Sequence, residues 1–228
     1  HELGPRPATA RAATRYAMVN YLSTLAYQAP YFGLPVVVLV NVSSATNSSF
    51  YVAWGIVAIA FYVPSAIGQA LLAEGGKDGA QLRSQMRLAL ALAIGLMAAG
   101  AAVTYLGKGI VTAAYGDDYA DAAHILPAMM LAGIPWAVTS LFLTEARVRH
   151  RHGATVTITL VLTVAILVPA MILVPSDGSL SGLDGASAAW LGGNLVAAAV
   201  ATVVKLVGLH HETGRLAAAE LDPLAPVA

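Results

Sequence analysis

The sequence predicts an all-α integral membrane protein with six transmembrane helices. Hydrophobic residues make up 58% of the 228 residues and charged residues 11%, against about 25% charge in soluble domains. Residues 16–73 contain no Asp, Glu, Lys or Arg, and this stretch is long enough for two helices of about 20 residues. The net charge is zero, which gives no reason to expect nucleic acid, and the absence of cysteine excludes disulfides and thiolate chemistry.

Five polar or charged runs divide the apolar sequence into six segments, which together form one predicted helical bundle, residues 16–209. The runs are the polar 41–49, the charged 74–87, the acidic 115–123, the basic 145–152 and the Gly/Ser/Asp-rich 176–184. A cytoplasmic arm, residues 1–15, precedes the bundle, and a poorly ordered cytoplasmic tail, residues 210–228, is expected after it. The six predicted spans are 17–42, 50–73, 88–107, 124–144, 153–174 and 185–204.

Prolines within the predicted spans indicate kinks or breaks, because proline removes a helix hydrogen bond and clashes with the preceding turn. The candidate hinges are Pro30 and Pro35 in the first span, Pro64 in the second and Pro135 in the fourth. The alternative interpretation is ordinary composition, since transmembrane helices contain more proline and glycine than soluble helices.

Four polar side chains near these prolines are candidates for a substrate pathway: Asn20, Tyr27, Gln28 and Gln69. Burying an unpartnered amide or hydroxyl in hydrocarbon costs roughly 2–7 kcal/mol, so such groups should face a cavity or another helix. If the first two spans form an antiparallel hairpin, all four lie in its cytoplasmic half and could converge.

Small and hydroxylated residues recur every four positions in three spans. The faces Ala91/Gly95/Ala99 and Ala189/Gly193/Ala197/Ala201 predict close helix packing. Thr155, Thr159 and Thr163 share one face, and we favour hydroxyls bonded to their own helix backbone over a stripe that lines a pathway.

The acidic run contains Asp117-Asp118-Tyr119-Ala120-Asp121, a D-D-x-x-D pattern. In prenyl-diphosphate enzymes such carboxylates share Mg²⁺ ions. A second acidic motif is missing from the sequence, so we favour a solvated loop. The histidines lack the i, i+4 spacing of a helical metal site, and we assign no metal ligands and no catalytic residues.

Basic residues are distributed unevenly about the six predicted spans. Eleven of the 12 Lys and Arg residues fall on the side that carries both chain ends, and Lys108 alone falls on the other. The positive-inside rule therefore places both termini in the cytoplasm and the protein in the cytoplasmic membrane.

The chain resembles the C-terminal half of the MOP flippase superfamily, in its polysaccharide-exporter branch. The resemblance rests on Tyr27-Gln-Ala-Pro-Tyr-Phe-Gly-Leu-Pro-Val36, Phe50-Tyr-Val-Ala-Trp54, Gly116-Asp-Asp-Tyr-Ala-Asp-Ala-Ala-His-Ile-Leu-Pro127 and Gly185-Ala-Ser-Ala-Ala-Trp190. It implies two bundles of at least six helices around a cavity that opens alternately to each side. The sequence departs from that pattern in having no Lys or Arg deep within a predicted span, so cations for a pyrophosphate-linked lipid would lie in the other half.

The resemblance implies half of a flippase for lipid-linked oligosaccharide or a related amphiphile, driven by an ion gradient and without a cofactor. The partners would be the lipid bilayer, the lipid-linked sugar and a second six-helix half, either an N-terminal half or another copy of the chain. The alternatives are a membrane enzyme that uses Asp117 to Asp121 on a prenyl or phospholipid substrate, and a non-catalytic membrane subunit.

The orientation is testable by labelling single cysteines in intact cells. Cysteines at positions 43–48 and 179–184 should react with a membrane-impermeant thiol reagent, because these positions are predicted to face outward. Cysteines at Gly79 and His152 should react only after the cells are opened. Labelling of position 79 from outside would contradict the orientation.

Overall fold

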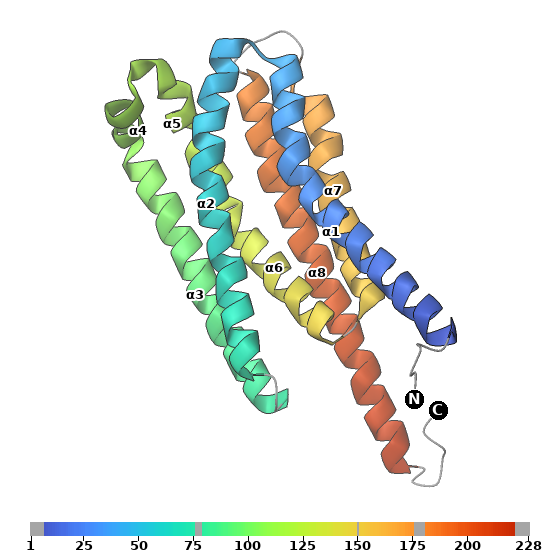
Figure 1. Cartoon of the computed structure of the whole chain (residues 1–228). Helices are drawn as coiled ribbons and strands as arrows, with labels where there is room; N and C mark the ends of the chain where they lie inside the picture. Colours follow the sequence, from blue (N-terminus) through green and yellow to red (C-terminus); the bar gives the residue numbers. More distant parts are fainter. Residues whose placement is uncertain (1–6, 76–78, 150, 176–180, 222–228) are drawn as a thin grey trace, which may run out of the picture.

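The computed structural model describes residues 7–75, 79–149, 151–175 and 181–221, and these residues form helices and short connections with no strand among them. All-α architecture is thereby confirmed. The elements are α1 (Pro7–Asn41), α2 (Ser44–Gly75), α3 (Gly79–Leu106), α4 (Lys108–Tyr115), the 3-10 helix η1 (Asp117–Tyr119), α5 (Ala120–Leu131), α6 (Gly133–Val148), α7 (His152–Leu173) and α8 (Ser181–Leu221) (Figure 1).

Five helices in the described part of the chain are long and apolar enough to cross a membrane, namely α1, α2, α3, α7 and α8. The η1–α5 segment and α6 form a pair bent by 40°, and counting this pair as one crossing raises the number to six. The predicted fourth span, 124–144, therefore corresponds to two helices joined at Ala132 rather than to one.

Most of the expected loops are shorter in the structure, because charged and polar residues continue the helices past the apolar segments. Residues 79–87, expected in a loop, begin α3, and α8 continues through the expected tail as far as Leu221. The polar run 41–49 contributes only a two-residue turn, since the Ser43 hydroxyl accepts a hydrogen bond from the Thr46 N–H (3.2 Å) and caps α2. The helix α4 was not predicted. Residues 1–6, 76–78, 150, 176–180 and 222–228 of the expected arm, loops and tail lie outside the described residues.

The candidate proline hinges do not interrupt their helices. Helix α1 continues through Pro30 and Pro35, and α2 continues through Pro64. The break of the fourth span lies at Ala132, three residues before Pro135. Pro135 occupies the first turn of α6, where a missing N–H removes no helix hydrogen bond.

The helices pack as two groups joined by α6. Helix α7 packs on both α1 and α8, while α2 packs on α3 and α5. Helix α6 contacts α2, α3 and α8, so it bridges the groups, whereas α1 and α2 make few contacts with each other. The first two spans are therefore an antiparallel hairpin whose arms separate, with α6 and α8 visible between them in Figure 1.

Only one of the two small-residue faces packs within the bundle. The face of Ala189, Gly193, Ala197 and Ala201 is buried, and a Cβ on Gly193 would lie 2.6 Å from the Ala165 carbonyl oxygen and 2.3 Å from Ile166 Cγ1. Ala91, Gly95 and Ala99 are exposed instead. Helix α3 packs through the adjacent face of Ala89, Ala93 and Met97, and four-residue spacing alone does not distinguish the two faces.

The approach of α7 and α8 at Gly193 predicts a difference between two neighbouring glycines. Gly193→Ala should lower the thermal stability of the purified protein, because overpacking against a backbone carbonyl typically costs about 1–3 kcal/mol. Gly192→Ala is the matched control, since a Cβ there meets nothing within 4 Å. Thermal unfolding in detergent measures both. Equal melting temperatures for the two variants would contradict the packing assignment.

Candidate functional site

A cavity of about 190 Å³ lies where α1 and α2 separate, with α6, α7 and α8 completing its wall. Three of the four predicted pathway residues line it: Tyr27 and Gln28 from α1 and Gln69 from α2. The side chain of Asn20 lies outside the described part of the structure. Pro30 lines the cavity, and Pro35, Pro64 and Pro135 are not among its lining residues.

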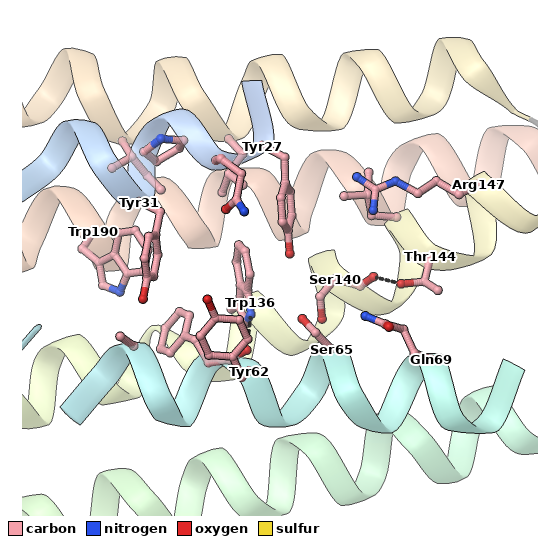
Figure 2. Close-up of a pocket in the computed structure, with 17 residues that line it drawn as sticks. Tyr27, Tyr31, Tyr62, Ser65, Gln69, Trp136, Ser140, Thr144, Arg147 and Trp190 are labelled. Carbon is pink, nitrogen blue, oxygen red and sulfur yellow. Dashed lines mark hydrogen bonds between the residues drawn. The ribbon is translucent and has the colours of Figure 1, made fainter. Parts of the chain in front are cut away.

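Aromatic rings form one wall of the cavity (Figure 2). Trp136 of α6 stacks on Tyr27 with 5.3 Å between ring centroids, and Phe61 of α2 lies 5.5 Å from Trp136. Phe61 also lies 5.3 Å from Trp190 of α8. The Trp136 indole N–H donates to the Phe61 carbonyl (3.1 Å), which fixes the ring across the gap between α6 and α2.

Trp190 is a buried residue of the wall with an unpartnered donor. It is 2% exposed and packs edge-on against Trp54 at 4.9 Å between centroids. Its Nε1 has no hydrogen-bond partner among the protein atoms. A buried donor without a partner carries a free-energy penalty of about 1–3 kcal/mol.

The other end of the cavity is polar. Ser65 and Gln69 of α2 face Ser140 and Thr144 of α6 across it (Figure 2). The Thr144 hydroxyl donates to the Ser140 carbonyl (2.7 Å), and the Ser140 hydroxyl donates to the Ala137 carbonyl (3.2 Å).

Arg147 supplies a cation at this polar end. Its side chain extends from the last turn of α6, and the guanidinium carbon lies 5.4 Å from the centroid of the Tyr27 ring (Figure 2). The residue is exposed, so its charge is open to solvent or ligand. Arg147 was predicted to lie in the basic run 145–152, and the structure places it in the last turn of α6, where it lines the cavity.

Helical spacing is the signal that could have identified the residues that were missed. Tyr62, Ser65 and Gln69 repeat at i, i+3 and i+7 along α2, and Ser140, Thr144 and Arg147 repeat at i, i+4 and i+7 along α6. The α2 set lies within the predicted second span, 50–73, whereas the α6 set crosses the end of the predicted fourth span at residue 144, which separated Arg147 from Ser140 and Thr144. The aromatic wall gave no comparable signal, because Trp136 and Trp190 are far apart in the sequence.

The wall at Pro30 depends on a hydroxyl from another helix. Pro30 has no N–H, which leaves the Ala26 carbonyl of α1 without its helical donor. The Thr163 hydroxyl of α7 hydrogen-bonds to this carbonyl and lies 2.9 Å from the Thr159 carbonyl of its own helix. Thr155 and Thr159 donate to carbonyls within four residues, as the backbone-bonding interpretation predicts.

The acidic motif lies apart from the cavity, in η1 and the first turn of α5. Asp117 and Asp118 are exposed, and the described residues contain no group of three His, Cys, Asp or Glu that could hold a metal ion. Asp121 lies at the N-terminal end of α5, where a negative charge complements the helix dipole. His124 pairs with Asp184 at 3.0 Å, joining the start of α5 to α8.

Comparisons of this chain with protein-family models, curated proteins and solved structures found no match.

The contact between Thr163 and Ala26 predicts energetic coupling with Pro30. Thr163→Val should destabilise the protein by about 1–3 kcal/mol, because it leaves the Ala26 carbonyl unpaired. In a Pro30→Ala background residue 30 regains its N–H, and the same Thr163→Val change should cost less than half as much. A double-mutant cycle in thermal unfolding measures the difference, with Thr159→Val as the control for losing a hydroxyl within α7. Equal costs in both backgrounds would exclude the coupling.

Proposed function

We propose that this chain is half of a membrane transporter that moves a lipid-linked oligosaccharide, or a related amphiphile, across the cytoplasmic membrane by alternating access. The observation that carries the proposal is the cavity between α1 and α2, which combines an aromatic wall with a polar end bearing Arg147. The resemblance to the MOP flippase superfamily supports the same conclusion. Both chain ends would be cytoplasmic, which places the polar end of the cavity on the side from which substrate enters.

The size of the cavity supports half of a site rather than a whole one. Pockets for drug-sized ligands measure about 300–1,000 Å³, and this cavity measures about 190 Å³. It has room for one sugar-sized or headgroup-sized portion of a ligand. A second six-helix half, from the same protein or another copy, would supply the facing wall.

The chemistry of the lining fits an anionic amphiphile. The faces of Tyr27, Phe61 and Trp136 offer apolar contact to a sugar ring or prenyl chain, and the amides of Gln28 and Gln69 offer hydrogen bonds to its oxygens. The planar guanidinium of Arg147 suits a phosphate, which it can bind through two parallel hydrogen bonds. A lipid-linked sugar diphosphate carries all three kinds of group.

The sparse contact between α1 and α2 suits a site that opens and closes. Moving these helices relative to each other disrupts little packing, whereas α1 and α7 would move together. The break at Ala132 gives α6 a second place to bend. We propose alternating access through these two features. Pro30, Pro35, Pro64 and Pro135 remain candidate hinges within it.

The proposal predicts that cavity residues control transport without controlling membrane insertion. Arg147→Gln should lower transport about tenfold or more, since a hydrogen bond to a charged group contributes about 1.5–3 kcal/mol. The pair Gln28→Leu with Gln69→Leu should also impair it. The measurement is complementation of a glycan-export defect in cells lacking the natural protein, with membrane abundance quantified in parallel.

Two control variants separate this function from its alternatives. Arg87→Gln removes an exposed cation of α3 outside the cavity and should leave export unchanged. Replacing Asp117, Asp118 and Asp121 by asparagine should also preserve export, whereas an enzyme that uses these carboxylates would lose its activity. Full export by the Arg147 variant and the double glutamine variant at normal abundance would reject the site.

A further inference from the structure

The last turn of α3 and the short helix α4 carry an exposed apolar surface at one end of the bundle. Leu106 is 84% exposed, Ile110 is 64% exposed and Tyr115 is 53% exposed. Together with the exposed Ala113 and Ala114 they form what we call the α4 surface. Contiguous apolar surface of this kind marks contact with a membrane or with another protein.

The side chains of α4 differ in character from one side of the helix to another. Val111 is buried in the main hydrophobic cluster, and α4 packs on α5 and η1. Thr112 lines an open groove beside α5. Ile110, Ala113 and Ala114, at i, i+3 and i+4, share a further side of the helix and are exposed. Helix α4 is therefore amphipathic, with its exposed apolar side turned away from Thr112.

The length of α3 places α4 at a membrane boundary. The apolar segment of α3 has 23 residues, Ser84–Leu106, which extend about 35 Å and so cross a hydrocarbon core about 30 Å thick. Helix α4 follows at the tip of α3, at the same end of the bundle as the start of α2 (Figure 1). Asp117 and Asp118, which come directly after α4 and Gly116, are exposed. Helix α4 thus lies between the end of an apolar segment and a charged turn, which is the level of lipid headgroups.

A tight turn at Gly107 holds α4 against the end of α3. The Gly107 N–H donates to the Val103 carbonyl and the Ile110 N–H donates to the Gly107 carbonyl, both at 2.8 Å. A Cβ on Gly107 would lie 2.8 Å from the Val103 carbonyl oxygen, so the turn has no room for a larger residue. The start of α4 is therefore fixed relative to the last turn of α3.

The α4 surface continues an exposed apolar side of α3, which indicates what covers it. Leu92, Leu96, Val103 and Leu106 lie on one side of α3, and all four are exposed. On a helix long and apolar enough to cross a membrane, such a side contacts lipid chains, which are as apolar as leucine. The α4 surface begins at Leu106, where this side of α3 ends, so the same lipid covers both.

We propose that α4 is an interfacial helix whose α4 surface inserts into the lipid headgroup region at this end of the bundle. Helices of this kind bury an apolar side about 5–10 Å into the boundary between headgroups and acyl chains. Tyr115 suits this level, because its ring is apolar and its hydroxyl is polar. The positive-inside rule predicts that the leaflet is the outer one. This contact is independent of what the central cavity transports.

The test uses spin labels on single cysteines in the full chain, reconstituted into phosphatidylcholine vesicles. The chain has no cysteine of its own, so each label has one position. Collisions with oxygen, which concentrates in lipid, and with a water-soluble nickel chelate measure the depth of the label. Ile110→Cys and Ala114→Cys should place it about 5–10 Å below the lipid phosphates. Thr112→Cys, on the opposite side of the same helix, should leave it at the phosphates or above them.

Two further positions calibrate the depth scale. Leu96→Cys, near the middle of the apolar segment of α3, should be deep in the bilayer, and Asp118→Cys should be in water. If the nickel chelate reaches Ile110 and Ala114 as readily as Asp118, the α4 surface faces water and the proposal is wrong. If oxygen and the chelate are both excluded from these two positions, protein covers the surface, as a second half or another copy would, and the assignment to lipid is overturned. Ile110 and Ala114 are both exposed, so either one tests the proposal if the other variant fails to fold.

Discussion

The need to satisfy every backbone polar group inside an apolar medium governs this bundle. A proline in the interior of a helix leaves one carbonyl without its helical donor, and the protein must supply another partner or bring the group to a wet surface. At Pro30 the Thr163 hydroxyl of α7 provides that partner, which ties α1 to α7 rather than to α2. The separation of α1 from α2 creates the central cavity. The position of the cavity is therefore linked to how the Ala26 carbonyl is satisfied.

The aromatic residues of the wall both pack in the core of the bundle and line the cavity. Phe61, Trp136 and Trp190 belong to the main hydrophobic cluster and also line the cavity, so part of the core of the bundle is also the surface offered to a ligand. In lipid, apolar burial between helices contributes little, and close van der Waals packing contributes more. Rings that stack across α1, α2, α6 and α8 provide such packing while leaving their faces available. Tryptophan combines both uses because its N–H can bond to a backbone, as Trp136 does with Phe61.

Hydropathy predicted the helical class and the approximate positions of the apolar helices, because the cost of burying charge is read directly from composition. Polar side chains within the apolar spans also identified Tyr27, Gln28 and Gln69 as a group, and these three residues line one cavity. Hydropathy did not identify Arg147 as a site residue, because the predicted apolar span ends at residue 144 and α6 continues to Val148. It placed the interruptions at prolines, whereas the break at Ala132 follows from how α5 and α6 each pack on α2 and α3. Tertiary contacts of that kind have no local sequence signature.

The break at Ala132 makes α6 a lever whose tip is the Arg147 guanidinium. Fifteen residues separate the two positions, and at 1.5 Å per residue the arm is roughly 22 Å long. A change of only about 10° in the angle at Ala132 would displace the far end by roughly 4 Å, which is more than the length of a hydrogen bond. A small change of angle at Ala132 could therefore move Arg147 into or out of contact with the rest of the cavity lining while the helices that anchor the break hardly move.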